Sequence, residues 1–221
     1  MRIDILTLFP NMFDGFLNES IIKRAIVKGR VTINIVDFRK YSKLSNNQVD
    51  DTPYGGGGGM VLRIEPIYDA IMDIKKDDPD AKVILLTPDG VPYKQEMAIN
   101  LKDEKHLIFI CGHYEGFDER IRTLCDMEIS IGDYVLTGGE LPAMVISDSI
   151  IRLLDGVITD TSLVSESFTD KLLDYPTYTK PQEFMGMKVP DILLSGDHAK
   201  IEAWREQERI KKTNERRPDL M

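Results

Sequence analysis

The sequence is short of cysteine and of long apolar runs. Its 221 residues include two cysteines, Cys111 and Cys125, with no C-x-x-C pair, which argues against a disulfide framework and provides no zinc motif. No apolar run reaches the roughly eighteen residues of a membrane-spanning helix. The start, MRIDILTLFP, lacks the small-residue cleavage site of a secretory signal. We therefore expect a cytoplasmic protein that does not act on membranes.

Several common active-site motifs are also missing. There is no G-x-x-x-x-G-K-[ST] loop for a nucleoside triphosphate, no strand that leads into G-x-G-x-x-G, and no G-x-S-x-G nucleophile elbow. The three histidines, His106, His113 and His198, have no metal-ligand spacing. We expect no dedicated metal site.

The net charge of −9 is unevenly distributed. Residues 1–49 carry a net +4, residues 50–160 a net −12 and residues 161–221 a net −1. Two stretches are basic, one over residues 24–43 and one over residues 200–217. Charge alone favours ordinary solvated faces, but local patches rather than the total decide whether a protein binds a polyanion.

Apolar strands and amphipathic helices alternate along the chain. The pattern predicts strands over 2–9, 31–38, 81–86, 106–112 and 127–132. It predicts helices over 19–28, 65–76, 93–101, 117–124, 140–154 and 195–212, the last with Asp197 as its N-cap. This rhythm is typical of an α/β fold, with a parallel sheet that helices cover on both faces.

The periodicity stops after Asp155. The next stretch, to residue 182, is rich in Ser, Thr, Asp and Pro, and it is long for a loop inside a compact domain. We expect a main domain over 1–160, a flexible linker or active-site loop over 161–182, and a small, mainly helical C-terminal domain over 183–221.

Three glycine-containing segments follow expected strands. They are TPDG at 87–90, CGHYEGFDER at 111–120 and SIGDYVLTGGELPA at 130–143. Ligands of open α/β sheets bind beyond the carboxyl ends of the strands. Glycine lets the backbone itself touch a ligand, although any one of these glycines alone is as well explained by a turn. The run DTPYGGGGGM, residues 51–60, lies between a strand and a helix of one domain, so it is not a linker.

Five blocks together resemble the bacterial tRNA (guanine-N1)-methyltransferase family, which methylates the guanosine at position 37, just 3′ of the anticodon. They are DDTPYGGGGGM, CGHYEGFDER, SIGDYVLTGGELPA, LLDYPTYTKP and LLSGDHAKIEAWR. The match runs in order from LTLFP to RRPDL and covers nearly the whole chain. GDYVLTGGELPA is far more specific than any single glycine motif.

The resemblance implies a parallel sheet tied in a deep trefoil knot of the SPOUT type, a homodimer whose subunits share each active site, and tRNA as the partner. It also implies S-adenosyl-L-methionine as the methyl donor. By similarity, the residues that bind this donor are Leu86, Thr87, Pro88, Gly112, Tyr114, Glu115, Ile131, Gly132, Asp133, Tyr134, Val135, Leu136, Gly138, Gly139 and Pro142.

Guanine N1 carries a proton at neutral pH, so methylation requires a base, and negative charge then develops on O6. The family uses an aspartate as the base and an arginine near O6. The matching positions here are Glu166 and Arg152. Glu166 departs from the family by one methylene, and Lys171 departs where the family usually has glycine.

The resemblance further implies contacts with tRNA. By similarity we assign them to Asp50, Tyr54, Gly59, Ser167 and Asp174, and we expect phosphate contacts from the basic stretches, including Lys211 and Lys212. The family's reaction is metal-dependent, which implies Mg²⁺ at a site the sequence leaves open. Two alternatives stay open: another knotted RNA methyltransferase, acting on a ribose 2′-hydroxyl or a different base, and a non-catalytic RNA-binding relative.

Overall fold

The computed structural model describes residues 1–159 and 166–221, which form two compact units, Met1–Ile158 and Thr159–Met221. The predicted end of the main domain, residue 160, lies two residues beyond this division. Residues 161–165 of the predicted linker lie outside the described residues.

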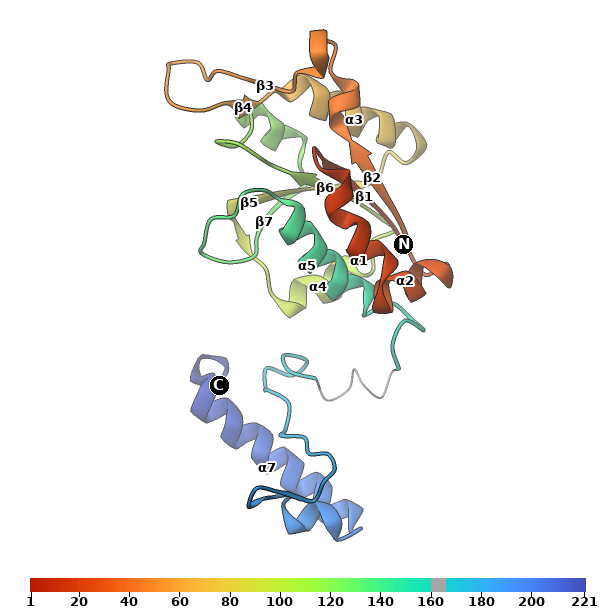
Figure 1. Ribbon diagram of the computed structural model, residues 1–221, viewed down its shortest axis with the longest axis vertical. Helices are drawn as coiled ribbons and strands as arrows, with labels where there is room; N and C mark the ends of the chain where they lie inside the picture. The colour runs from red at the N-terminus through yellow and green to blue at the C-terminus, as the bar shows by residue number, and fades with distance from the viewer. Residues whose placement is uncertain (160–165) are drawn as a thin grey trace. The chain divides into compact units, whose positions relative to one another are not determined.

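The first unit is built on a five-stranded parallel sheet (Figure 1). Its strands are β1 (Arg2–Thr7), β2 (Thr32–Asp37), β5 (Lys82–Pro92), β6 (His106–Cys111) and β7 (Met127–Ser130), in the order β2-β1-β6-β5-β7. The central strands are short apolar runs buried on both faces, as expected of a covered parallel sheet. The predicted α/β architecture with a parallel sheet is confirmed.

Helices cover both faces of this sheet. They are α1 (Asp14–Asn18), α2 (Ser20–Val27), α3 (Ile64–Asp77), α4 (Gln95–Leu101) and α5 (Glu140–Ile151). Successive strand residues alternate between two cores: Ile5 packs with α2, α4 and α5, whereas Leu6 packs with α3. Figure 1 shows α1, α2, α4 and α5 together on one face. An antiparallel pair, β3 (Asp50–Asp51) and β4 (Val61–Leu62), closes the base of the glycine run.

Two local predictions were wrong. The strand predicted over 81–86 does not end before TPDG at 87–90, because β5 continues through this segment with a register shift between Leu86 and Val91. A side chain at Gly90 would lie 2.5 Å from the Ile129 backbone nitrogen, so close packing on β7 keeps this stretch in the strand. The helix predicted over 117–124 is a short 3₁₀ helix, Glu119–Leu124, which the Asp118 carboxylate caps through the Arg120 amide.

A buried polar cluster lies at the start of the sheet. The Asp4 carboxylate is fully buried and meets Nε2 of His106 at 2.6 Å, Nδ2 of Asn34 at 2.6 Å and Nε of Arg2 at 2.9 Å. His106 is buried too, and its Nδ1 lies 3.0 Å from an Asp78 carboxylate oxygen. The cluster therefore links three neighbouring strands through one carboxylate.

Truncating this carboxylate is expected to destabilise the first unit strongly. Asp4→Ala removes the buried carboxylate that Nε2 of His106, Asn34 and Arg2 share, which costs about 3–5 kcal/mol of unfolding free energy. Denaturant unfolding measures this, with Asp103→Ala, an exposed aspartate, as the control. A loss below about 1 kcal/mol would show that the cluster does not stabilise the sheet.

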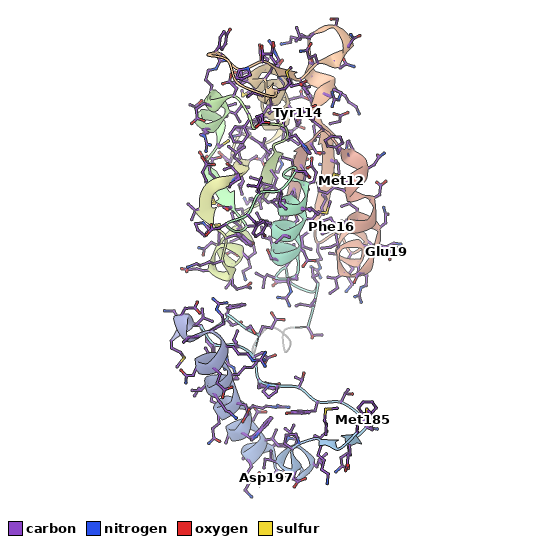
Figure 2. The ribbon with its side chains drawn as sticks, turned by 60° about the vertical axis from the view of Figure 1, so that its left-hand side comes forward. Met12, Phe16, Glu19, Tyr114, Met185 and Asp197 are labelled. Carbon is purple, nitrogen blue, oxygen red and sulfur yellow. The ribbon has the colours of Figure 1, made fainter. Side chains whose placement is uncertain are left out.

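The second unit consists of a hairpin and one long helix. The hairpin pairs β8 (Glu183–Phe184) with β9 (Met187–Lys188), and Met185 and Gly186 form its turn with positive φ angles (Figure 2). The long helix, α7 (His198–Arg216), begins after Asp197, whose side chain accepts a hydrogen bond from the Lys200 amide. The predicted N-cap is confirmed.

Candidate functional site

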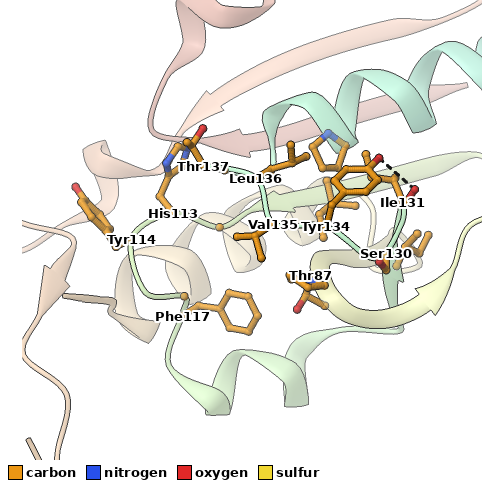
Figure 3. Close-up of a pocket in the computed structure, with 18 of the residues that line it drawn as sticks. Thr87, His113, Tyr114, Phe117, Ser130, Ile131, Tyr134, Val135, Leu136 and Thr137 are labelled. Carbon is orange, nitrogen blue, oxygen red and sulfur yellow. Dashed lines mark hydrogen bonds between the residues drawn. The ribbon is translucent and has the colours of Figure 1, made fainter. Parts of the chain in front are cut away.

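A cavity of about 280 Å³ lies where the chain leaves β5, β6 and β7 (Figure 3). Its walls are Leu86, Thr87, Pro88, Gly112, His113, Tyr114, Glu115, Gly116, Phe117, Ile129, Ser130, Ile131, Gly132, Tyr134, Val135, Leu136, Thr137, Gly138, Gly139 and Pro142. Its size is near the lower end for small-molecule sites. The cavity occupies the edge of the sheet where α/β proteins bind their ligands.

Two glycines let the walls approach backbone to backbone. The Gly139 amide donates to the Gly112 carbonyl at 3.0 Å. A Cβ on Gly139 would lie 2.6 Å from the Cα of Cys111, and a Cβ on Gly138 would lie 2.3 Å from the His113 ring. Larger residues at 138 and 139 would therefore push apart the segment after β6, residues 111–120, and the segment after β7, residues 130–143. These are the second and third of the three glycine-containing segments, and the cavity depends on glycine at both positions.

The third segment folds back on itself to form one wall. The Tyr134 hydroxyl donates to the Ile131 carbonyl at 3.3 Å, as the dashed line in Figure 3 shows. The Ser130 hydroxyl lies 3.2 Å from the Gly132 carbonyl and 3.3 Å from its amide. Hydrogen bonds between residues two or three positions apart thus shape a stretch that has no regular secondary structure.

A buried carboxylate supports the cavity from behind. Glu140, the first residue of α5, is 1 % exposed; it accepts a hydrogen bond from the Thr7 hydroxyl at 2.6 Å and meets His113 Nε2 at 2.7 Å. The His113 ring packs on Phe9, with 4.6 Å between ring centroids. The carboxylate therefore joins β1, the segment after β6 and the start of α5. Burial raises the pKa of the neighbouring Cys111 thiol, which fits an inert structural cysteine.

Fourteen of the fifteen residues predicted to bind the methyl donor line this cavity. The exception is Asp133, which belongs to the same segment but is not among the walls. Six further wall residues were not predicted: His113, Gly116, Phe117, Ile129, Ser130 and Thr137. Five of the six belong to the glycine-containing segments 111–120 and 130–143, and Ile129 lies at the end of β7. Assigning these whole segments to the donor site would have included the five residues that single positions missed.

The glycine run lies against the cavity's second segment. Gly59 has φ +78°, and a Cβ there would lie 2.3 Å from Cγ of Glu115, a wall residue. The Glu115 amide donates to the Met60 carbonyl at 3.1 Å. Asp50 lies at the base of the run in β3, whereas Tyr54 is fully exposed. The structure thus brings Gly59 beside the cavity and leaves the Tyr54 ring open to a partner.

The two predicted catalytic residues belong to different units. Arg152 is the C-cap of α5, and its amide donates to the Asp148 carbonyl at 3.1 Å. It follows Pro142, a cavity wall, by ten residues, which corresponds to about 15 Å along an α-helix. Glu166 belongs to the second unit, where its side chain is half-buried.

The segment 166–175, which we call the carboxylate segment, forms a closed turn within the second unit. The Asp174 amide donates to the Ser167 hydroxyl at 2.9 Å, and the Phe168 amide donates to the Leu172 carbonyl at 2.8 Å. Ser167 and Asp174, two predicted tRNA contacts, therefore lie side by side. Lys171 adopts φ +68°, a conformation that favours glycine, which is the residue the resemblance led us to expect there.

The described residues contain no group of three or more His, Cys, Asp or Glu side chains that could hold a metal ion. Within the same residues, no helix has the length and apolar character needed to cross a membrane.

Comparison with known proteins gives a consistent result over the whole chain. The sequence profile of the family described as "tRNA (Guanine-1)-methyltransferase TrmD" matches residues 1–221. The "tRNA (guanine-N(1)-)-methyltransferase" of Geobacillus kaustophilus (strain HTA426) is 57 % identical over 223 residues, covering 100 % of this chain and 91 % of that protein. Proteins with the same name from Staphylococcus carnosus (strain TM300) and Listeria monocytogenes serovar 1/2a (strain ATCC BAA-679 / EGD-e) are 56 % and 55 % identical, covering 100 % of this chain and 91 % and 92 % of their own lengths.

Proposed function

This chain belongs to the tRNA (guanine-N1)-methyltransferase family, and from that premise we propose that it methylates N1 of a guanine in tRNA. The methyl donor is S-adenosyl-L-methionine. The observation that carries the proposal is the glycine-lined cavity, which gathers fourteen of the fifteen residues assigned to the donor by similarity.

The residues of the cavity fit this donor. Leu86, Ile131 and Leu136 offer apolar walls for a flat base. Gly112, Gly138 and Gly139 present bare backbone, whose amides and carbonyls can pair with an adenine edge without loss of rotamer freedom. When bound, S-adenosyl-L-methionine supplies a methyl group on a cationic sulfur, and residues 50–160, which build the cavity, carry a net −12.

Two charged residues are proposed to act on the guanine. The Glu166 carboxylate removes the N1 proton, and the Arg152 guanidinium stabilises the charge that develops on O6. The Asp174 carboxylate accepts from the N–H donors on the guanine edge. Ser167 lies beside it, since the Asp174 amide donates to the Ser167 hydroxyl at 2.9 Å. The extra methylene of Glu166 is tolerated only if its carboxylate still reaches N1 within hydrogen-bond distance.

We propose that the enzyme works as a homodimer with shared active sites. The separation of about 15 Å between Pro142 and Arg152 along α5 exceeds the length of an arginine side chain. This separation supports an active site that residues of a second copy complete. We further propose that the close crossing of Gly139 over Cys111 and Gly112 belongs to a deep trefoil knot of the SPOUT type.

The substrate position we propose is guanosine 37, next to the anticodon, which places the enzyme in the cytoplasm with its tRNA. Asp50, Tyr54 and Gly59 form the tRNA-facing loop of the first unit. The glycine run leaves that loop with little side-chain bulk, and the Tyr54 ring is fully exposed, which suits stacking on a nucleotide. The resemblance implies Mg²⁺, and the described residues contain no group of three or more His, Cys, Asp or Glu side chains to hold it.

The experiment that tests this function is nucleoside mass spectrometry of tRNA after incubation with the enzyme and S-adenosyl-L-methionine. We expect 1-methylguanosine as the product. A ribose-methylated nucleoside or a different methylated base would instead indicate another RNA methyltransferase. Binding of S-adenosyl-L-methionine without any methylated nucleoside would indicate a non-catalytic relative.

Two exposed cations of α7 are expected to contact tRNA phosphates. Lys211 and Arg216 are exposed and make no ion pair within the described residues, whereas Lys212 donates to the Asp174 carbonyl. The double change Lys211→Glu, Arg216→Glu should raise the tRNA KM about tenfold and lower the salt slope of tRNA binding by about one per residue. Filter binding at several salt concentrations measures this. An unchanged salt slope would place the phosphate contacts elsewhere, and the Kd for S-adenosyl-L-methionine should stay constant.

A further inference from the structure

The basic face of α7 is largely occupied by the protein's own carboxylate segment. Arg209 Nη2 donates to Asp170 Oδ1 at 2.5 Å, and Lys212 Nζ donates to the Asp174 carbonyl at 2.8 Å. The Thr213 hydroxyl accepts from the Leu173 amide at 2.9 Å. Residues 209, 212 and 213 share one face of a helix, so three successive points of the segment are fastened to one surface.

Two arginines extend this contact to both ends of the segment. The Arg205 guanidinium lies 4.7 Å from the ring centroid of Tyr175, and the Arg217 guanidinium lies 5.8 Å from that of Phe168. Both distances are within the range of cation–π attraction. The carboxylate segment is therefore in contact with α7 and its C-cap residue Arg217 from its third residue, Phe168, to its last, Tyr175.

The buried residues of α7 are polar, which is unusual for a packed helix. They are Arg209, 8 % exposed, and Thr213, fully buried. Burying a guanidinium is costly unless it is paired, and an apolar residue would pack as well. The hydrogen bond from Arg209 lowers the pKa of Asp170, so the pair is ionised at neutral pH. A shift of the segment along α7 would therefore separate the buried guanidinium from the Asp170 carboxylate.

The contacts with α7 fix the turn that carries the substrate-facing groups. Within the segment, Asp174 is bonded to Ser167, and the Asp170 carboxylate also accepts from the Leu172 amide at 3.3 Å. Lys171, which has a positive φ, lies between Asp170 and Leu172 in this turn. Glu166 directly precedes Ser167, where the hydrogen bond to Asp174 closes the turn. The contacts that fix the turn therefore also fix the position of the Glu166 backbone.

We propose that Arg209, Lys212 and Thr213 are positioning residues for methyl transfer, which hold the carboxylate segment so that Glu166 and Asp174 meet the guanine together. This inference rests on the proposed function of that segment. The basic stretch over residues 200–217 then has two roles. Arg209 and Lys212 bind Asp170 and the Asp174 carbonyl of the enzyme itself. Lys211 and Arg216 contact the tRNA phosphates.

The test compares Arg209→Gln, Asp170→Asn and the double variant with wild type. Single-turnover methyl transfer at saturating tRNA should fall about 10- to 100-fold in each single variant, because small misplacement of a reacting group is costly. The double variant should lose little more than either single one, since both remove the same contact. The Kd for S-adenosyl-L-methionine should not change. Glu215→Gln, a change to an exposed side chain of α7, is the matched control and should keep the wild-type rate at saturating tRNA.

Hydrogen exchange supplies a readout that does not depend on turnover. In wild type, the amides of Phe168, Leu173 and Asp174 should be protected, and Arg209→Gln should expose them while α7 stays protected. Lost protection with an unchanged rate would overturn the proposal, as would unprotected amides in wild type. If wild type makes no 1-methylguanosine, the proposed function fails, yet the exchange result still decides whether α7 holds the segment.

A second variant covers the case in which Arg209→Gln unfolds α7. Thr213→Val removes the acceptor for the Leu173 amide and keeps the volume of the buried side chain. A lower rate with α7 still protected supports the positioning role. A wild-type rate with the Leu173 amide exposed contradicts it.

Discussion

Gly139→Ala is expected to weaken binding of S-adenosyl-L-methionine by roughly one to two orders of magnitude. The new Cβ would lie 2.6 Å from the Cα of Cys111 and 3.0 Å from the Gly112 amide nitrogen, and both neighbours are backbone atoms. The Gly139–Gly112 hydrogen bond would break and the two segments would separate. Overpacking of this kind costs about 1–3 kcal/mol or more, which corresponds to roughly 10- to 100-fold in Kd or beyond.

Isothermal titration calorimetry measures this effect, and the chain offers graded controls. Gly58→Ala adds a Cβ to open space, so the Kd should stay at the wild-type value. Gly112→Ala meets only the Phe117 ring, at 3.3 Å, which a side chain can relieve, so its effect should be intermediate. A Kd for Gly139→Ala within twofold of wild type would mean that the cavity is not the donor site.

Glu166→Gln is expected to lower the rate of methyl transfer about 100- to 10,000-fold. The amide keeps the size of the side chain but cannot take the N1 proton from guanine. The Kd for S-adenosyl-L-methionine should not change, because the residues assigned to the donor belong to the first unit and Glu166 to the second. Single-turnover kinetics at saturating tRNA separates this chemical step from binding.

Two further variants serve as controls for Glu166→Gln. Glu166→Asp restores the residue expected from the family and should keep at least the wild-type rate. Glu215→Gln changes an exposed carboxylate on α7 and should have no effect. Full activity in Glu166→Gln would move the base to another group, with Asp170 and Asp174 the nearest carboxylates along the chain.

The parallel sheet and its cavity were predictable because their signals are local. Short apolar runs such as HLIFIC separate strands from amphipathic helices, and the alternation of Ile5 and Leu6 assigns two covered faces. The cavity follows from the rule that ligands bind beyond the strand ends, combined with the glycines after β6 and β7. The assignment of a methyl donor came from the resemblance, not from these patterns.

Other features depend on contacts between distant residues. Thr7 and Glu140 are 133 positions apart, so the carboxylate that joins β1 to the cavity wall has no signature in either stretch. The continuation of β5 through TPDG is set by the fit of Gly90 against Ile129, not by local propensity. Tertiary packing decides both cases.

Charge patterning does not show which partner each cation has. A basic stretch reads the same whether its cations face RNA or the protein, so Lys212 was grouped with Lys211. The structure separates the two, because Lys212 donates to the Asp174 carbonyl 38 positions away and Lys211 does not. The left-handed φ of Lys171 was equally hidden, since lysine gives no sign of a glycine-like turn.

The most direct test of the account is methyl transfer to two tRNA transcripts that differ only at position 37, guanosine in one and adenosine in the other. Nucleoside mass spectrometry of the digests identifies the product, and nuclease mapping locates it. We expect 1-methylguanosine at position 37 of the guanosine transcript and no methylation of the other. Equal methylation of both transcripts, or a methyl group on the ribose, would contradict it.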